Sequence, residues 1–277
     1  MLYIVLGGAV LFVALYLLMI FPAKASEAVR ERLAGRNYAH RGLHDIEAGI
    51  PENSRAAFRA AVENGYGSEL DVRLTADDKV VVFHDSDLLR ACGAKTEVGD
   101  ISYDELREYK LFKTDETAPL FSEVLEIVGG KEPLIVEIKP EKDRQRSYEN
   151  CRLTNEMLRS YKGDYCIESF DPYIMRWFYK NSKETVRGHL AMRISWYRGK
   201  SKIAAFLVSR LLTNVLCRPH FIAYKHDDRC ISRALAKLFG AMSFVWTLTK
   251  ETDGQRLERS EDGIIFEGYR PTPRYRR

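Results

Sequence analysis

The sequence lacks the features that mark nucleic-acid-binding, redox and disulfide-stapled proteins. Lys and Arg number 43 against 39 Asp and Glu, so the 277 residues carry a net charge of only +4. A nucleic-acid-binding domain normally gathers basic residues in one stripe, so we expect no nucleic-acid partner. The five cysteines are scattered and form no C-x-x-C pair, which favours free thiols in a reducing compartment over a zinc site, a redox couple or a disulfide framework.

The sequence also contains no internal repeat, low-complexity stretch or Gly/Ser linker that would divide it. Its length and its 45% content of hydrophobic residues are enough for one sizeable α/β domain, although two small domains would also fit. Oligomeric state is not indicated.

The N-terminal stretch lacks charge altogether. Residues 2–21 are almost continuously apolar and match the ~20 residues that a helix needs to cross a bilayer core. The alternatives are a buried core helix and a signal peptide cleaved near Ala23-Lys24-Ala25. Because no basic residue precedes the run, we predict a transmembrane anchor at 1–23, followed by a juxtamembrane linker or helix at 24–36.

The charges around this segment predict its orientation. Lys24, Arg30, Arg32 and Arg36 follow it, and no Lys or Arg precedes it. Basic residues are enriched on the cytoplasmic side of membrane segments. We therefore predict a single-pass protein of the cell membrane whose soluble domain faces the cytoplasm.

Strand-like and helix-like segments alternate through the remaining residues, 37–277. Apolar runs bounded by turn residues predict strands at 37–40, 68–72, 79–83, 134–139, 165–167, 186–190, 221–224, 242–246 and 263–266. Counting the main strands gives eight that alternate with helices. This pattern predicts a (β/α)8 TIM barrel.

Charged residues and histidines stand at the ends of several predicted strands, where a TIM barrel builds its active site. They are His40 with Arg41, Glu69 with Asp71, His84, and Glu137 with Lys139. Glu69 and Asp71 share one face of their strand because side chains alternate with a period of two. All of these side chains can point into one mouth.

Each residue type in this group suggests a chemical role. Three converging carboxylates, Glu69, Asp71 and Glu137, repel one another without a cation, so they suit a hard divalent ion such as Ca²⁺ or Mg²⁺. Taken alone, Glu69-Leu70-Asp71 would also fit a solvated edge strand. His40 and His84 suit proton transfer near neutral pH.

Arg41 and Lys139 are cationic donors of the kind that a phosphoryl group requires, which makes phosphodiester cleavage the natural reaction. If Arg41 only paired with Asp71 or Glu52, its role would be structural. The other four histidines are interpreted as structural: His44, His189, His220 and His226.

Five motifs in order resemble those of glycerophosphodiester phosphodiesterases. They are His40-Arg41-Gly42, Pro51-Glu52-Asn53-Ser54, Glu69-Leu70-Asp71-Val72, Val82-Phe83-His84-Asp85 and Val136-Glu137-Ile138-Lys139. Weaker likenesses follow at Ser169-Phe170, Trp246-Thr247 and residues 262–265. The resemblance implies a TIM barrel that hydrolyses glycerophosphodiesters to sn-glycerol 3-phosphate and an alcohol.

Residue roles follow from the same resemblance. It implies that Glu69, Asp71 and Glu137 bind Ca²⁺ or Mg²⁺, with Glu52 as a further participant. It makes His40 and His84 the acid/base pair, and assigns phosphate or substrate binding to Arg41, Lys139 and Trp246.

The sequence departs from the family pattern at three places. Ser54 replaces a threonine, Trp246-Thr247-Leu248-Thr249 lacks an expected asparagine, and Phe266-Glu267-Gly268 stands where an aspartate-proline ending is commoner. These departures concern the substrate pocket more than the core chemistry.

Residues 196–215 combine basic and apolar side chains, which predicts a basic amphipathic helix. The helix would either pack on the barrel in the ordinary way or make a second contact with anionic lipid. Lipid contact would admit lysophospholipids as substrates, so the alternative activity is that of a lysophospholipase D or a phospholipase C-like phosphodiesterase. A non-enzymatic binding or scaffold role is disfavoured, because a scaffold has no need for both histidines and all three carboxylates.

Overall fold

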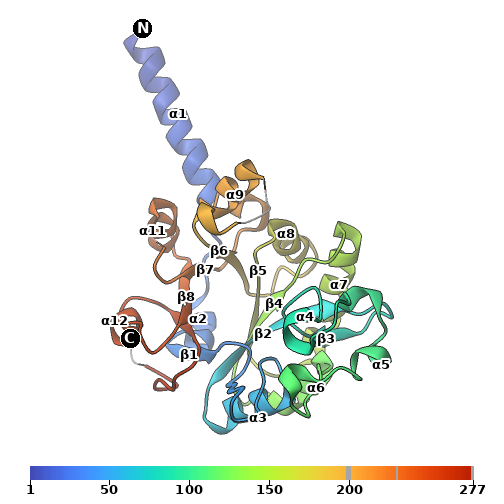
Figure 1. Cartoon of the computed structure of the whole chain (residues 1–277). Helices are drawn as coiled ribbons and strands as arrows, with labels where there is room; N and C mark the ends of the chain where they lie inside the picture. The colour runs from blue at the N-terminus through green and yellow to red at the C-terminus, as the bar shows by residue number, and fades with distance from the viewer. Residues whose placement is uncertain (198–200, 229, 276–277) are drawn as a thin grey trace.

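The computed structural model describes residues 1–197, 201–228 and 230–275, and it confirms the predicted TIM barrel (Figure 1). Its sheet has nine strands, of which all but β3 pair in parallel. The ring closes because β1 (Arg36–Ala39) pairs with both β9 (Gly263–Phe266) and β2 (Gly67–Leu74). The strands between are β4 (Leu134–Ile138), β5 (Tyr165–Ser169), β6 (Arg187–Ala191), β7 (Phe221–Lys225) and β8 (Met242–Leu248).

The predicted strand at 79–83 forms β3 (Val80–Val82), but it lies outside the ring. It pairs antiparallel with the last residues of β2, from Val72 opposite Val82 to Leu74 opposite Val80. β2 thus extends beyond the barrel, and the chain then folds back along it as β3 to form a hairpin. This hairpin returns the chain to the mouth, where the Phe83 N–H donates to the Asp71 carbonyl over 3.0 Å.

Helices follow the strands and form the outer ring (Figure 1). They are α3 (Arg55–Glu63), α6 (Phe121–Val128), α7 (Arg144–Ser160), α8 (Pro172–Asn181), α9 (Lys202–Ser209), α10 (Asn214–Cys217), α11 (Ile231–Leu238) and α12 (Gly254–Glu258). The insertion before α6 carries α4 (Leu89–Cys92), α5 (Tyr103–Leu106) and 3-10 turns at Val98–Asp100 and Leu111–Lys113. Side-chain caps begin several helices, as when Ser54 accepts from the Ala57 N–H at the start of α3.

The segment between the N-terminal helix and the barrel is packed rather than free. Leu33 of its helix α2 (Glu27–Leu33) belongs to the buried cluster inside the barrel that includes Tyr38 and Phe244. Ala25, which precedes the N-cap of α2, belongs to the same cluster. The Tyr38 hydroxyl donates to the Leu33 carbonyl over 2.6 Å. The segment therefore belongs to the folded domain.

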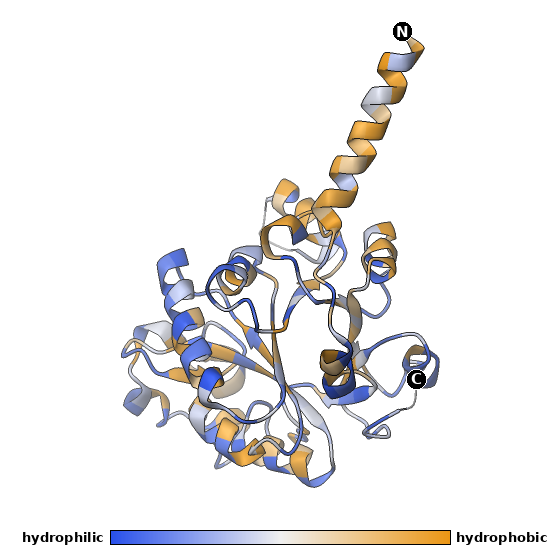
Figure 2. Ribbon diagram, turned by 180° about the vertical axis from the view of Figure 1, so that it is seen from behind, coloured by the Kyte–Doolittle hydropathy of each residue, from blue (hydrophilic) through white to orange (hydrophobic). Residues whose placement is uncertain are grey.

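The N-terminal helix α1 (Leu2–Ile20) projects away from the barrel beside α9 and α11 (Figure 1). At 19 residues it is about 28 Å long. It is long and apolar enough to cross a membrane, and only 6% of its most apolar window is buried. Figure 2 shows that hydrophobic residues cover it almost throughout.

The prediction of one continuous helix over residues 196–215 is wrong. The described part contains a 3-10 turn (Ile194–Trp196), then α9, then α10. Leu211 takes a φ of 57° and is fully buried, which ends α9 and turns the chain toward α10. Arg198 and Lys200 lie outside the described residues.

In the barrel interior, Gly188 lies directly against an aromatic ring. A Cβ on Gly188 of β6 would overlap the ring of Phe221, which itself stacks on Phe244 with centroids 4.7 Å apart. We expect Gly188→Ala to lower the free energy of unfolding by about 1–3 kcal/mol, because overpacking forces the core to shift. Urea unfolding followed by circular dichroism would measure this.

The control is Gly99→Ala, where the new Cβ would meet its nearest neighbour at an ordinary 3.7 Å. Equal stability of the two variants would contradict the packing described for the barrel interior.

Candidate functional site

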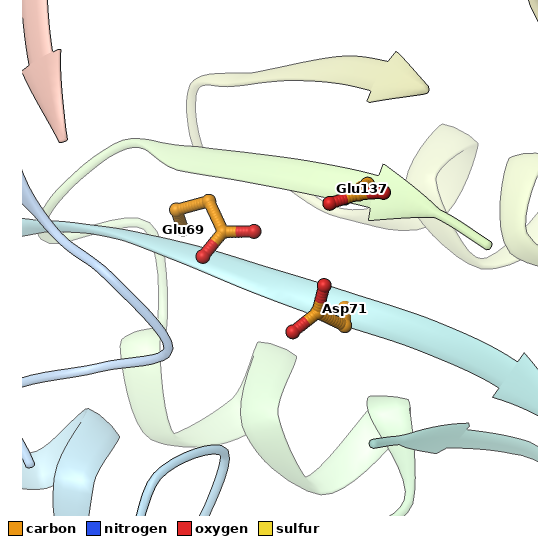
Figure 3. A group of neighbouring side chains, drawn as sticks. All are labelled: Glu69, Asp71 and Glu137. Atoms are coloured by element: carbon orange, nitrogen blue, oxygen red, sulfur yellow. The ribbon is translucent and has the colours of Figure 1, made fainter. Parts of the chain in front are cut away.

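Three buried carboxylates meet at the mouth of the barrel (Figure 3). Glu69 and Asp71 come from β2, and Glu137 comes from β4, where it is the register partner of Asp71. One oxygen of each carboxylate lies within 4.8 Å of the others. The alternation of side chains along β2 and the parallel pairing with β4 bring the three groups together.

The carboxylates need positive charge nearby. Burial, followed by the charges of Asp71 and Glu137, raises the pKa of Glu69 well above its usual value. Burial would also raise the pKa of Asp71, but Lys139, His84 and Arg41 hold it well below its usual value. The Lys139 ammonium bridges Asp71 and Glu137, with Nζ 2.8 Å from an oxygen of each. Such buried oxygen donors fit a hard divalent cation, which would offset the remaining repulsion at Glu69.

A sharp turn after β1 places His40 and Arg41. Arg41 and Gly42 have φ angles of 55° and 79°. A Cβ on Gly42 would lie 2.8 Å from the Cβ of Ala57 in α3, so glycine is required there. The turn brings the Arg41 backbone N–H to 3.0 Å from Glu69 Oε2.

The Arg41 guanidinium makes both pairings that the sequence allowed. Nη1 donates to Glu52 Oε1 over 2.7 Å, and Nε lies 3.5 Å from Asp71 Oδ2. Asn53 supports the same corner, because its Nδ2 donates to Asp71 Oδ2 over 2.8 Å. The Glu52-Asn53-Ser54 motif thus holds Arg41, holds Asp71 and starts α3.

Glu52 lies beside the carboxylate cluster and is engaged by guanidinium groups. Arg90, at the start of the insertion, donates to both oxygens of Glu52 over 2.7 and 2.9 Å. Burial would raise the pKa of Glu52, but the hydrogen bond from Arg90 and the charge of Arg41 lower it. Arg90 was missed from the sequence, because only the fold brings the insertion back to the mouth.

Arg90 also connects this corner to His84. Its Nε donates to Asp85 Oδ2 over 2.6 Å, while Asp85 Oδ1 lies 2.7 Å from His84 Nδ1. Burial opposes ionisation of Asp85, but the hydrogen bonds from His84 and Arg90 lower its pKa below the usual range. The orientation of His84 therefore depends on a charged chain that runs from Arg41 through Glu52, Arg90 and Asp85.

His40 has a carboxylate partner of its own. Its Nδ1 lies 2.6 Å from Glu267 Oε2 at the end of β9, and its Nε2 lies 3.9 Å from Glu69 Oε2. The hydrogen bond with His40 lowers the pKa of Glu267 to about 2. His44, which we interpreted as structural, also lies near this carboxylate, with Nε2 3.9 Å from Glu267 Oε1. The departure from the aspartate-proline ending was the sequence signal that could have identified Glu267.

Trp246 lies at the end of β8, and no direct contact joins it to the carboxylates in the described part of the chain. Its ring meets Phe170 edge to face with centroids 5.7 Å apart, and Phe170 meets Tyr197 in the same way at 6.4 Å. The Trp246 Nε1 is buried with no hydrogen-bond partner among the described residues. These three rings form an aromatic wall at the mouth.

A cavity of about 750 Å³ opens beside Glu267, the carboxylate partner of His40. It lies between the loop after β1 and the loop after β9, and its polar lining includes His44, Lys250 and Arg270. It is large enough for a small polar ligand.

The model of the glycerophosphoryl diester phosphodiesterase family matches residues 40–267, which include the carboxylates and both histidines. The chain belongs to this family. Enzymes of the family are phosphoric diester hydrolases and typically depend on a divalent metal.

Relatives and solved structures agree with the assignment. A glycerophosphodiester phosphodiesterase of Caldanaerobacter subterraneus is 27% identical over 82% of this chain and 91% of its own length. A lysophospholipase D of Rattus norvegicus is 35% identical over 48% of this chain, and the match spans only 45% of that enzyme. The glycerophosphodiester phosphodiesterase structure of Thermotoga maritima has a TM-score of 0.64 at 27% identity, covering 83% of this chain and 93% of that one.

A phosphodiesterase of Oleispira antarctica, solved with its product sn-glycerol-3-phosphate, has a TM-score of 0.70 at 20% identity. It covers 86% of this chain and 94% of its own, which shows the shared fold.

The contact between Glu267 and His40 leads to a prediction. Glu267→Gln keeps the shape of the side chain and an acceptor oxygen for a His40 Nδ1–H, but it removes the negative charge that stabilises a protonated His40. We expect kcat for phosphodiester hydrolysis to fall about tenfold or more, and its pH profile to move, while KM changes little. Initial rates over a pH series would measure both quantities.

Glu267→Asp is the conservative comparison, since it retains the charge. An unchanged kcat and pH profile in Glu267→Gln would show that the contact has no part in positioning His40.

Proposed function

We propose that this protein hydrolyses glycerophosphodiesters to sn-glycerol 3-phosphate and an alcohol, using Ca²⁺ or Mg²⁺. The observation that carries the proposal is the buried cluster of Glu69, Asp71 and Glu137, flanked by two histidines that each have a carboxylate partner. The product bound in the Oleispira antarctica structure gives the same substrate class for that enzyme.

In this proposal Glu69, Asp71 and Glu137 hold the cation, which when bound supplies positive charge to the phosphoryl oxygens. Arg41 and Lys139 add donors for the same oxygens. Glu52 enters as the partner of Arg41 and Arg90, because both of its oxygens already accept from guanidinium groups. Trp246 is assigned to the wall of the substrate pocket.

His40 and His84 form the acid/base pair. Each histidine has Nδ1 directed at a carboxylate, which leaves Nε2 to exchange a proton with the substrate. One histidine accepts a proton from the attacking hydroxyl, either a water, which gives sn-glycerol 3-phosphate directly, or the glycerol hydroxyl of the substrate, which gives a cyclic glycerol phosphate that a water must then open to the same product. The other histidine protonates the leaving oxygen.

The same proposal places the enzyme at the cell membrane, with residues 1–23 as a single-pass anchor and the barrel, 37–277, in the cytoplasm. Basic residues after α1, among them Lys24 and Arg30, support this orientation. Contacts between the end of α1 and the barrel support a retained helix over a cleaved signal peptide. For example, Arg218 donates to the carbonyls of Leu18 and Phe21, each over 2.8 Å.

A second candidate activity is that of a lysophospholipase D or a phospholipase C-like phosphodiesterase. The aromatic wall favours it, because Phe170 and Tyr197 also pack against Ala205 and Val208 of α9, the helix beside α1. An acyl chain would find an apolar surface there. The relative from Rattus norvegicus carries the name lysophospholipase D.

Phosphorus NMR separates the two activities. We expect the full-length protein to release glycerol 3-phosphate from glycerophosphocholine and glycerophosphoethanolamine when Ca²⁺ or Mg²⁺ is present, and to be inactive with EDTA. His40→Ala and His84→Ala should each reduce the rate at least about 100-fold, because each removes a proton-transfer group.

His226→Gln is the control for loss of a histidine away from the carboxylates. Turnover confined to lysophosphatidylcholine would favour the second activity, and unchanged hydrolysis in His40→Ala would remove the acid/base assignment.

The repulsion at Glu69 predicts how metal and stability are linked. Adding Ca²⁺ or Mg²⁺ at about 100 times its Kd should raise Tm by about 5 °C, because the folded state alone presents the three carboxylates together. Glu69→Gln should raise Tm in EDTA by removing one like charge, and should lose most of the increase that the cation produces.

Differential scanning calorimetry would measure both effects, with the exposed Glu126→Gln as the matched control. An undiminished cation effect in Glu69→Gln would show that Glu69 is not a ligand.

A further inference from the structure

Helix α11 turns large apolar side chains outward, although Ala236 and Leu235 on its inner side pack into the hydrophobic core in the ordinary way. Its buried side includes Ser232 and Arg233, whereas Ile231 is 74% exposed and Leu238 is 77% exposed. The two exposed residues stand seven apart, on one face of the helix, with the exposed Ala234 between them. An outward apolar face of this kind calls for an apolar environment.

Helix α9 presents a similar face next to it. Ile203 is 73% exposed and Phe206 is 47% exposed, three residues apart on one side, while Ala205 and Val208 pack inward. Figure 2 shows hydrophobic colouring on the helices around the base of α1. Two neighbouring helices therefore direct large apolar side chains outward at the place where α1 leaves the domain.

Helix α1 is held by direct contacts to α11 and to α10, the short helix that follows α9. The Tyr16 hydroxyl and Ser232 Oγ are 3.0 Å apart, and Asn214 Nδ2 donates to the Ile20 carbonyl over 3.0 Å. The rings of Phe21 and Phe239 stack with centroids 5.1 Å apart. The buried polar side of α11 thus holds α1, which leaves the apolar side of α11 facing outward.

The length of α1 brings its neighbours into the bilayer. Its 19 residues, about 28 Å, only just match a hydrocarbon core of about 30 Å, so the last turns of α1 must also lie within the membrane. A groove of about 640 Å³ runs beside those turns, between Phe12 to Met19 of α1 and Phe206, Leu212 and Ile231. Side chains that line the groove lie at the same depth as the turns they face.

We propose that the outer faces of α9 and α11 around α1 form a lipid-contacting platform, defined by Ile203, Phe206, Ile231 and Leu238, that inserts into the bilayer interface. The groove beside α1 takes a lipid acyl chain. Exposed Lys202 on α9 and exposed Arg210 at its C-terminal cap, which also lines the groove, supply positive charge for anionic head groups. The proposal rests on the anchoring role proposed for α1 and does not depend on the catalytic assignment.

The test uses full-length protein in vesicles of phosphatidylcholine and phosphatidylglycerol, prepared with and without bromine on the acyl chains. A tryptophan is introduced in Ile231→Trp or Leu238→Trp, at positions exposed enough to accept it without repacking. We expect brominated lipid to quench the added fluorescence about twofold or more, because bromine quenches only tryptophans in contact with the acyl region.

The matched control is Leu89→Trp, an apolar residue of α4 that is 50% exposed and lies on a part of the barrel away from α1 (Figure 1). Quenching at positions 231 and 238 no greater than at position 89 would overturn the platform.

Flotation of the wild-type protein with the same vesicles separates the possible failures. Flotation without quenching removes only the platform, whereas absence of flotation removes both the anchor and the platform. Hydrolysis of glycerophosphocholine in detergent is measured in parallel, and it reports on the proposed activity independently of either result.

Discussion

The mutual repulsion of three buried carboxylates is the constraint on which the rest of the site depends. Glu69, Asp71 and Glu137 share a space in which each makes ionisation of the others more costly. Removing such groups from water is tolerable only when charge and hydrogen bonds compensate them. The surroundings of the cluster meet that need. Lys139 bridges Asp71 and Glu137, and the turn after β1 brings the Arg41 backbone N–H to Glu69 and its guanidinium to Asp71.

A second layer of charges fixes the groups that act on the substrate. His40 is hydrogen-bonded to Glu267, and His84 is hydrogen-bonded to Asp85. Glu52 and Arg90 connect the second of these pairs to Arg41. Because these charged side chains are paired with one another, a substitution at one position also changes the contacts of its neighbours. The positions of both histidines are therefore set by contacts within the protein and not by contacts with the substrate.

If the proposed platform contacts the bilayer, the aromatic wall at the barrel mouth lies close to the membrane surface. Phe170 and Tyr197 join the barrel mouth to α9, and α9 lies beside α1. A rigidly held anchor would keep the barrel at one orientation to the bilayer, which a flexible linker would not do. Such placement suits substrates that leave the membrane or that stay partly inserted in it.

The sequence by itself determined the barrel and the three carboxylates that meet at its mouth. Alternating strands and helices predicted the (β/α)8 fold, and the period of two along residues 68–72 predicted that Glu69 and Asp71 face the same way. These features are local, so a single stretch of sequence carries them. Positions at the ends of predicted strands gave Glu137, Lys139 and both histidines, and the ordered motifs added Glu52 and Trp246.

Only the tertiary structure decided which residues from distant segments of the chain come into contact. The β2–β3 hairpin brings His84 level with Asp71, Arg90 reaches Glu52 from an insertion, and Glu267 reaches His40 from the last strand. The break near Leu211 and the outward apolar face of α11 were likewise invisible, because burial there depends on contacts with Tyr224 and α1. Local pattern reports which face of an element is apolar, and the fold alone decides what that face meets.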